Sequence, residues 1–351
     1  MMNCVKAKLV RAFAAAAAAV LMFSLPRKNT AAVPAHDAVR FLDLLPNITR
    51  GLDLVARSAD ETDAPTAVIT VWNGSEALTM SLTDYIIGVT AAEMPASYGL
   101  EALKAQAVAA RTFTLKHVIG ELRCKSGRTV CTDPGCCQAF VTVEQMKKNW
   151  GSNFDKYYNK VRSAVVSTDG QVLVSGGELV TALYHSSSGG RTEDCEAVFA
   201  VALPYLVSVE SEGEEDSPEY MAVKTYSNEE FTRIINEKFP DAEMTDPAKD
   251  VEVWQRTESG RIALIRLGGT VRTGQQLRTA LKLHSTNAEF SFSGDTVKVT
   301  CYGFGHGVGM SQCGANAMAK QGAGYEEILK HYYTGVELIS ILPGTKLWAV
   351  D

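Results

Sequence analysis

A glutamate that precedes a predicted alanine-rich helix is the residue best suited to chemistry in this sequence. Glu93 follows the largely apolar segment 89–92 and stands before Met94-Pro95. Burial among apolar neighbours raises a carboxyl pKa, as a general acid working near neutral pH requires. Lys104 and Arg111 on the following helix would lower that pKa if they lay close to the carboxyl group. A glutamate that caps the helix or pairs with one of these cations is the structural alternative.

The helix predicted from about Leu100 to Val118 carries polar side chains on both sides of a stripe of small residues. Lys104 and Arg111 lie at one edge of this stripe, and Gln106 lies at the other. Cations and an amide at these positions can orient hydroxyl, N-acetyl or carboxylate groups of a sugar. A stripe that packs on another element, with solvated charges beside it, is the structural alternative.

Two glycine-containing motifs follow further along the chain. The first begins at Tyr184 and continues through Ser188 to a pair of glycines, and the second places four glycines around His306. Such loops allow close approach of the backbone, and Tyr184 offers a ring face and a hydroxyl. The second motif is not a dinucleotide fingerprint, because no strand, turn and helix with a suitably spaced acidic residue frame it. A strand tyrosine, a loop serine and a core histidine are the structural alternatives.

Four of the eight cysteines lie within one short segment. Cys124, Cys131 and Cys137 are spaced as thiolate ligands on a loop can be, and zinc is the natural occupant of such a soft site. A disulfide, for example between Cys124 and Cys131, is the alternative in an exported chain. The adjacent pair Cys136 and Cys137 is not expected to form a disulfide, because the ring would be strained.

The bulk properties describe an ordinary globular chain behind an apolar leader. The chain has 351 residues and a formal charge of −6, so it has no global positive field to hold nucleic acid. Three basic residues precede the apolar run Ala12–Leu25, and two more follow it. This arrangement predicts a signal or membrane anchor over residues 1–28, and the late position of the only cleavage-like site favours an uncleaved anchor. Residues 29–65 are typical of a linker.

From residue 66 onward the pattern predicts an α+β domain. The segment from Thr66 reads as a strand, and Asn73-Gly74 predicts a type I′ hairpin turn. A short helix capped by Ser81 or Thr83 is expected through Gly88. Strands and helices then mix without regular βαβ repeats. The domain is expected to span residues 66–345, with residues 211–300 as a candidate inserted α/β subdomain.

The three motifs together resemble the stage II sporulation protein D family of peptidoglycan lytic transglycosylases, over about residues 66–338. The resemblance implies that Glu93 is the catalytic acid and base, in a cleft formed with the following helix and the Tyr184 and His306 loops, and that His306 is a supporting residue. It further implies that substrate is bound by residues of the helix and of the first glycine motif, namely Lys104, Gln106, Arg111, Tyr184 and Ser188. The bond cleaved would join N-acetylmuramic acid to N-acetylglucosamine, leaving a 1,6-anhydro end.

The resemblance also bears on cofactor, partners and location. Some relatives hold zinc near this loop through a histidine and two cysteines. Here Cys124 would replace that histidine, and Cys136 stands where a histidine is common. The implied setting is engulfment during sporulation, with a single-pass membrane anchor and an extracytoplasmic catalytic domain. The implied partners are glycan strands without stem peptides, an amidase and a multi-pass membrane protein. A zinc-dependent cell-wall amidase and a non-catalytic glycan-binding module are the alternatives.

Overall fold

The computed structural model describes residues 53–55 and 66–341, which fold into two compact units. Of these described residues, unit 1 contains those up to Ala182, Gly324–Lys330 and those from Gly335 to Ile341, and unit 2 contains Leu183–Ala323 and His331–Thr334. The predicted anchor lies outside the described residues, as does most of the predicted linker. Within the described ranges, no helix has the length and apolar character needed to cross a membrane. The expectation of a mixed α+β chain is confirmed.

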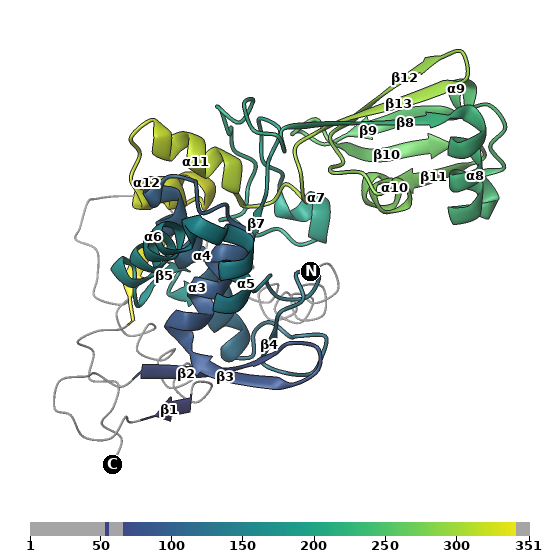
Figure 1. Cartoon of the computed structure of the whole chain (residues 1–351). Helices are drawn as coiled ribbons and strands as arrows, with labels where there is room; N and C mark the ends of the chain where they lie inside the picture. The colour runs from purple at the N-terminus through teal and green to yellow at the C-terminus, as the bar shows by residue number, and fades with distance from the viewer. Residues whose placement is uncertain (1–52, 56–65, 342–351) are drawn as a thin grey trace, which may run out of the picture. The chain divides into compact units, whose positions relative to one another are not determined.

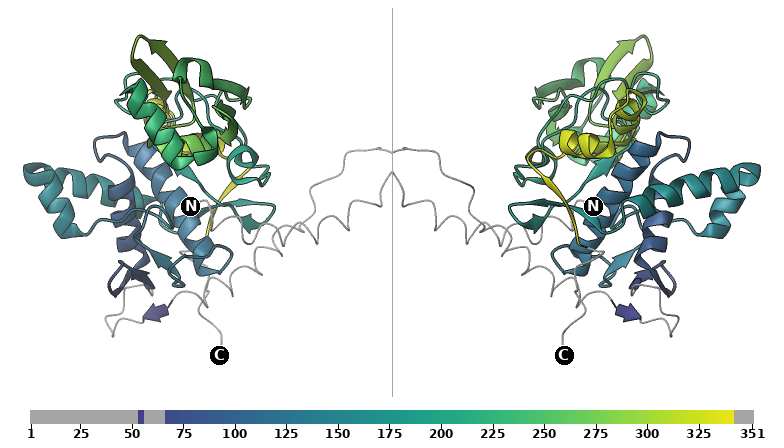
Figure 2. Two further views of the ribbon diagram at one scale, coloured as in Figure 1. Left: turned by 90° about the vertical axis from the view of Figure 1, so that its right-hand side faces the viewer. Right: turned by 90° about the vertical axis from the view of Figure 1, so that its left-hand side faces the viewer.

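Unit 1 is built on packed helices flanked by two small sheets (Figures 1 and 2). Its helices are α3 (Leu82–Glu93), α4 (Leu100–Val118), α5 (Val143–Trp150), η1 (Gly151–Asn153), α6 (Phe154–Ser167) and the first part of α12 (Tyr325–Tyr332). One sheet contains β1 (Asp53–Val55), β2 (Thr66–Trp72), β3 (Ala77–Ser81) and β4 (Val130–Cys131). The other contains β5 (Gln171–Ser175), β6 (Glu178–Leu179) and β15 (Glu337–Ser340).

The predicted hairpin forms, but its turn is not of type I′. β2 and β3 pair antiparallel from Val68 opposite Ser81 to Trp72 opposite Ala77. A type I′ turn needs positive φ at both central residues, and Gly74 has it while Asn73 does not. The Asn73 side chain instead accepts the backbone N–H groups of Ser75 and Glu76, both at 2.9 Å, and closes a longer loop.

Helix α3 continues beyond the residue at which the sequence predicted its end. Ser81 caps it as expected, accepting the Asp84 N–H at 3.0 Å. Gly88, where the sequence predicted the end of the helix, lies in the helix interior. The residue is glycine because a side chain at this position would have no space. A Cβ atom at Gly88 would lie 2.2 Å from the Phe140 ring and 2.8 Å from the Val141 carbonyl oxygen. The helix therefore ends at Glu93, just before Met94-Pro95.

Unit 2 contains two three-stranded sheets with helices beside them (Figure 1). The sheets are β11-β10-β9 and β12-β13-β8, made of β8 (Met221–Ser227), β9 (Val251–Arg256), β10 (Ile262–Leu267), β11 (Thr270–Thr273), β12 (Ala288–Ser293) and β13 (Thr296–Tyr302). The helices beside these sheets are α8 (Asn228–Lys238), η2 (Pro240–Ala242), α9 (Pro247–Asp250) and α10 (Gly274–Leu281). The same unit also contains α7 (Cys195–Phe199) and α11 (Gln312–Lys320). A core of buried apolar residues between Tyr226 and Cys301 joins both sheets, α8 and α10.

The two glycine motifs lie side by side within unit 2. β7 (Tyr184–His185) pairs in parallel with β14 (Met310–Ser311), and Ser187 exchanges two backbone hydrogen bonds with Phe304, at 3.1 and 2.8 Å. One residue, Val308, fixes both histidines. Its N–H donates to His306 Nδ1 at 3.0 Å, and its carbonyl lies 3.2 Å from His185 Nδ1, which must carry a proton to bond there.

We expect Gly88→Ala to destabilise the protein, although alanine normally favours a helix interior by about 1 kcal/mol over glycine. The added methyl group must displace Phe140, which is crowding of a kind that costs about 1–3 kcal/mol. Urea unfolding of the parent and variant proteins measures this difference. A variant more stable than the parent would show that the Phe140 ring does not occupy this space.

We also expect acid to weaken unit 2 through the buried imidazole of His185. Burial, assisted by the positive charge of Arg261, lowers the pKa of His185 to about 3 from an ordinary 6.5. His185 is therefore neutral in the fold at a pH where the unfolded chain carries the proton. Its contribution is complete above about pH 6.5 and is lost as the pH falls toward 3, by about 2 kcal/mol at pH 5.

The check is urea unfolding at pH 7.5 and pH 5 for the parent protein and for His185→Gln, which cannot titrate. The variant should lose less stability between the two pH values than the parent does. An equal loss in both proteins would show that His185 does not carry this dependence.

Candidate functional site

Glu93 is the last residue of α3, and its carboxylate is held by the backbone of a distant loop. The side chain is partly exposed, and its Oε1 accepts the N–H of Ala139 at 2.7 Å. A hydrogen bond of this length from a backbone group to a carboxylate fixes the orientation of the carboxyl plane. The structure therefore places a pre-oriented carboxyl group at a helix terminus, as an acid or base requires.

The loop that holds Glu93 runs along α3 for several residues. Beyond Ala139, the Phe140 ring stacks on Tyr85 with centroids 5.6 Å apart, and the Val141 N–H reaches the Gly88 carbonyl at 3.3 Å. Burial raises the pKa of Tyr85, and the neighbouring Cys137 thiol and the Glu93 carboxyl raise it further. We call residues 137–141 the bridging segment, because they connect the cysteine-rich loop to α3.

Lys104 forms an ion pair at the start of α4. Its ammonium group lies 2.7 Å from Glu101 Oε1, and it also lies over the Tyr325 ring at 5.5 Å. The second Glu101 oxygen accepts the Tyr325 N–H at 3.0 Å. Burial favours the neutral form of Glu101, but the hydrogen bonds from Lys104 and Tyr325 outweigh it and lower the pKa. Lys104 remains partly exposed, and its role with substrate stays a prediction.

Gln106 and Arg111 are buried side chains of α4. The Arg111 guanidinium donates to the carbonyls of Gln171 at 3.1 Å and Val165 at 3.2 Å, so it joins α4 to the end of α6 and to β5. Burial lowers the Arg111 pKa to about 10, and the nearby Asp169 offsets part of that effect. Both side chains are at most 1% exposed. Contact of either with substrate stays a prediction, and the interactions of Arg111 are structural.

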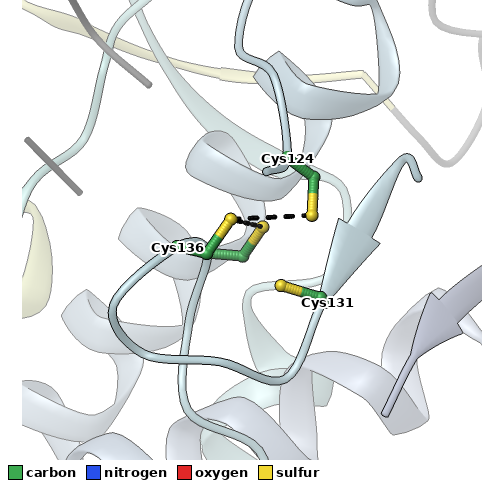
Figure 3. A group of neighbouring side chains, drawn as sticks. Cys124, Cys131 and Cys136 are labelled. Atoms are coloured by element: carbon green, nitrogen blue, oxygen red, sulfur yellow. Dashed lines mark hydrogen bonds between the residues drawn. The ribbon is translucent and has the colours of Figure 1, made fainter. Parts of the chain in front are cut away.

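The cysteine-rich loop brings four sulfur atoms together, not three. The Sγ atoms of Cys124, Cys131, Cys136 and Cys137 all lie within 4.8 Å of one another, and all four residues are buried. Figure 3 shows Cys124, Cys131 and Cys136 pointing toward a common centre, with Cys131 at the end of β4. The separation is 3.6 Å between Cys136 and Cys124 and 3.9 Å between Cys136 and Cys137. The sulfur atoms form no disulfide in this arrangement.

These separations match the requirements of a zinc ion. Four sulfurs at about 2.3 Å from one tetrahedral zinc lie roughly 3.8 Å apart, whereas a disulfide needs about 2.05 Å. Burial raises the pKa of Cys131 to about 12 and also raises that of Cys137. For Cys124, burial acts in the same direction, but hydrogen bonds from Ser126 outweigh it and lower the pKa. A metal ion would displace the protons that burial otherwise retains.

The first glycine motif is organised around a carboxylate that sequence reasoning missed. Glu214 is 1% exposed and accepts the hydroxyls of Ser187, Ser188 and Ser211 at 2.5, 2.7 and 2.5 Å, as well as the Ser188 N–H at 2.8 Å. Ser188 is fully buried, so its hydroxyl serves this network. Tyr184 is 4% exposed in β7. Direct contact of either residue with substrate stays a prediction.

The second glycine motif packs against a buried arginine. Arg261 donates to the Ser188 carbonyl at 2.6 Å and to the Arg191 carbonyl at 2.9 Å. A Cβ atom at Gly307 would lie 2.8 Å from its guanidinium, so glycine is needed for this approach. Burial lowers the pKa of His306 well below its ordinary value, and the adjacent His185 adds to the effect. His306 is partly exposed in unit 2, and its bond with the Val308 N–H shapes the loop.

The residues that sequence reasoning missed act through backbone groups or through long-range contacts. Ala139 contributes only an amide, and no side-chain pattern signals that. Tyr85 lies on α3 eight residues before Glu93, a spacing that places both on similar sides of a helix. Cys136 was noted only as standing where a histidine is common in the family, and its sulfur lies in the same cluster as that of Cys137. Glu214 stands in an acidic segment in which nothing local distinguishes it.

Comparison with known proteins agrees with the sequence motifs. Residues 74–174 match the family model described as stage II sporulation protein. The chain is 37% identical over 258 residues to stage II sporulation protein D of Bacillus subtilis, covering 73% of this chain and 74% of that protein, and the same figures hold for the Bacillus amyloliquefaciens protein. It is 33% identical over 306 residues to the amidase enhancer of Bacillus subtilis, covering 72% of this chain and 40% of that protein. The chain belongs to the stage II sporulation protein D family.

Proposed function

We propose that this protein is a peptidoglycan lytic transglycosylase in which Glu93 is both the general acid and the general base. The observation that carries the proposal is the Glu93 carboxylate, partly exposed at the end of α3 and oriented by the Ala139 amide at 2.7 Å. Membership of a sporulation family supports a role in the cell wall during engulfment. The cleft around Glu93 and the substrate contacts predicted for Lys104, Gln106, Arg111, Tyr184 and Ser188 belong to this proposal.

The reaction needs only one carboxyl group. Glu93 protonates the glycosidic oxygen between N-acetylmuramic acid and N-acetylglucosamine, and the bond from that oxygen to the muramic C1 breaks. The resulting carboxylate then accepts the proton of the muramic C6 hydroxyl as that oxygen bonds to C1. The products are a 1,6-anhydro end and a free N-acetylglucosamine hydroxyl. Water is not consumed, so the second carboxylate of a hydrolase is not required.

The proposal includes a zinc ion, a membrane anchor and partners. Cys124, Cys131 and Cys137 would hold the zinc, and the proximity of their sulfur atoms, which lie within 4.8 Å of one another, supports this assignment. A bound zinc ion would cross-link the cysteine-rich loop. The leader 1–28 would anchor the protein with the domain outside the membrane, and residues 211–300 would form an inserted subdomain. The likeness to an amidase enhancer supports an amidase partner that strips stem peptides, and a multi-pass membrane protein would complete the complex.

Two other functions would give different products. An amidase would use zinc with an open position to activate water, so chelation would abolish its activity and the glycan strands would stay intact. A glycan-binding module would bind strands without cutting them, and Glu93→Gln would leave that binding unchanged.

The test is mass spectrometry of peptide-free glycan strands after digestion. We expect the parent protein to release products that end in 1,6-anhydromuramic acid. Glu93→Gln, which cannot donate or accept the proton, should lower the rate by about 10²- to 10⁴-fold. Glu178→Gln provides the matched control, because Glu178 is an exposed carboxylate of β6 in the same unit. Its products and rate should equal those of the parent.

Each contrary outcome identifies another function. Products with reducing ends would mean a hydrolase with an unrecognised second carboxylate. Uncut strands that bind the parent and Glu93→Gln equally would mean a binding module. Full activity in Glu93→Gln would place the catalytic acid elsewhere.

A further inference from the structure

The chemistry of the thiol cluster depends on how many of its cysteines would bind the metal. Three thiolates leave one tetrahedral position for a water molecule, whereas four leave none. Cys136 decides between these cases. Its Sγ lies 3.6 Å from that of Cys124 and 3.9 Å from that of Cys137, on either side of the roughly 3.8 Å edge of a zinc tetrathiolate.

The backbone directs Cys136 and Cys137 toward the same centre. Both N–H groups bond to the Asp133 carbonyl, at 3.0 and 2.8 Å, and the Gly135 N–H bonds to the Asp133 side chain at 2.8 Å. This turn holds the two adjacent sulfurs on one side without a bond between them. The N–H of Lys125 also points at Cys136 Sγ at 3.0 Å, as outer groups commonly do around a ligating atom.

The bridging segment leaves the cluster at Cys137 and reaches Glu93 two residues later. Gln138 is buried, and its Nε2 donates to Thr114 of α4 at 2.8 Å. Ala139 then donates its N–H to Glu93, and the Phe140 ring stacks on Tyr85. A displacement of Cys137 is therefore transmitted through one residue to the amide that orients the carboxylate.

We propose that Cys136 is the fourth ligand of a closed tetrathiolate zinc site, and that this site serves the reaction only by holding the Ala139 amide against Glu93. The proposal rests on the function proposed above, and it gives the metal a positioning role. No coordination position remains for a reactive water molecule, so the site is not that of a zinc amidase.

The ligand set is tested on the purified full-length protein loaded with cobalt(II) in place of zinc. The intensity of thiolate-to-cobalt absorption follows the number of bound sulfurs. We expect Cys136→Ser to lose about a quarter of that intensity and to bind zinc at least about 10-fold more weakly, since even outer residues of metal sites have effects of this size. Cys301→Ser removes an equally buried cysteine of β13 outside the cluster and should change neither quantity.

The positioning role is tested by the amide resonance of Ala139 in protein labelled with ¹⁵N-alanine. We expect this resonance to shift when zinc is removed and in Cys136→Ser, and to shift also in Glu93→Gln. The kcat on peptide-free strands should fall with KM unchanged in Cys136→Ser, and Cys136→His, which keeps a ligand, should restore it. This variant also serves as the ligand test if Cys136→Ser fails to fold.

Two results would overturn the proposal. An unchanged cobalt spectrum in Cys136→Ser would remove Cys136 from the ligand set. An unmoved Ala139 resonance in metal-free, folded protein would remove the positioning role. The cobalt spectrum and the Ala139 resonance do not depend on glycan cleavage. A parent protein that releases no anhydro products would contradict the proposed function, but these two measurements would still test the ligand set and the positioning role.

Discussion

The docking of the bridging segment along α3 is the contact on which the candidate site depends. The absence of a side chain at Gly88 makes space for Phe140, and Phe140 in turn stacks on Tyr85. With the segment in this position, the Ala139 amide meets Glu93 at 2.7 Å. The orientation of the carboxylate is therefore set by packing and backbone geometry. Groups held in this way need to move little when charge changes during a reaction.

The bridging segment begins at the thiol cluster, because Cys137 belongs to both. A metal ion bound by these cysteines, as proposed above, would cross-link the loop between α4 and α5. The Asp133 turn brings Cys136 and Cys137 toward Cys124 and Cys131. Two of the four clustered cysteines, Cys136 and Cys137, lie within three residues of Ala139, whose amide binds Glu93.

Buried polar groups connect the glycine motifs of unit 2. Glu214 collects three serine hydroxyls, and Arg261 binds the Ser188 carbonyl behind them. Such networks are stable only when each group has its partners, because an unpaired buried charge is costly. This explains why the first glycine motif needs its serines, even though Ser188 itself is buried.

The sequence predicted the elements with strong local signals. α4 was predicted from its periodicity, and the Ser81 cap was correct. The end of α3 was wrong because a distant ring, not local propensity, decides whether Gly88 is tolerated. The site was predicted in part: Glu93 and three cluster cysteines carry recognisable chemistry. The Ala139 amide and Glu214 act through tertiary contacts that no spacing reveals. The number of cysteines in the cluster, the buried bonds of Arg111 and those of Ser188 follow from packing that sequence leaves open.

The proposed reaction cleaves the glycan with one carboxyl group and without water. Digestion of peptide-free strands in H₂¹⁸O distinguishes this reaction from hydrolysis, because the two differ in the source of the oxygen at the new end. We expect the parent protein to produce anhydro ends that carry no ¹⁸O. Newly formed ends labelled with ¹⁸O would show that water attacks the sugar, and would rule out the proposed reaction.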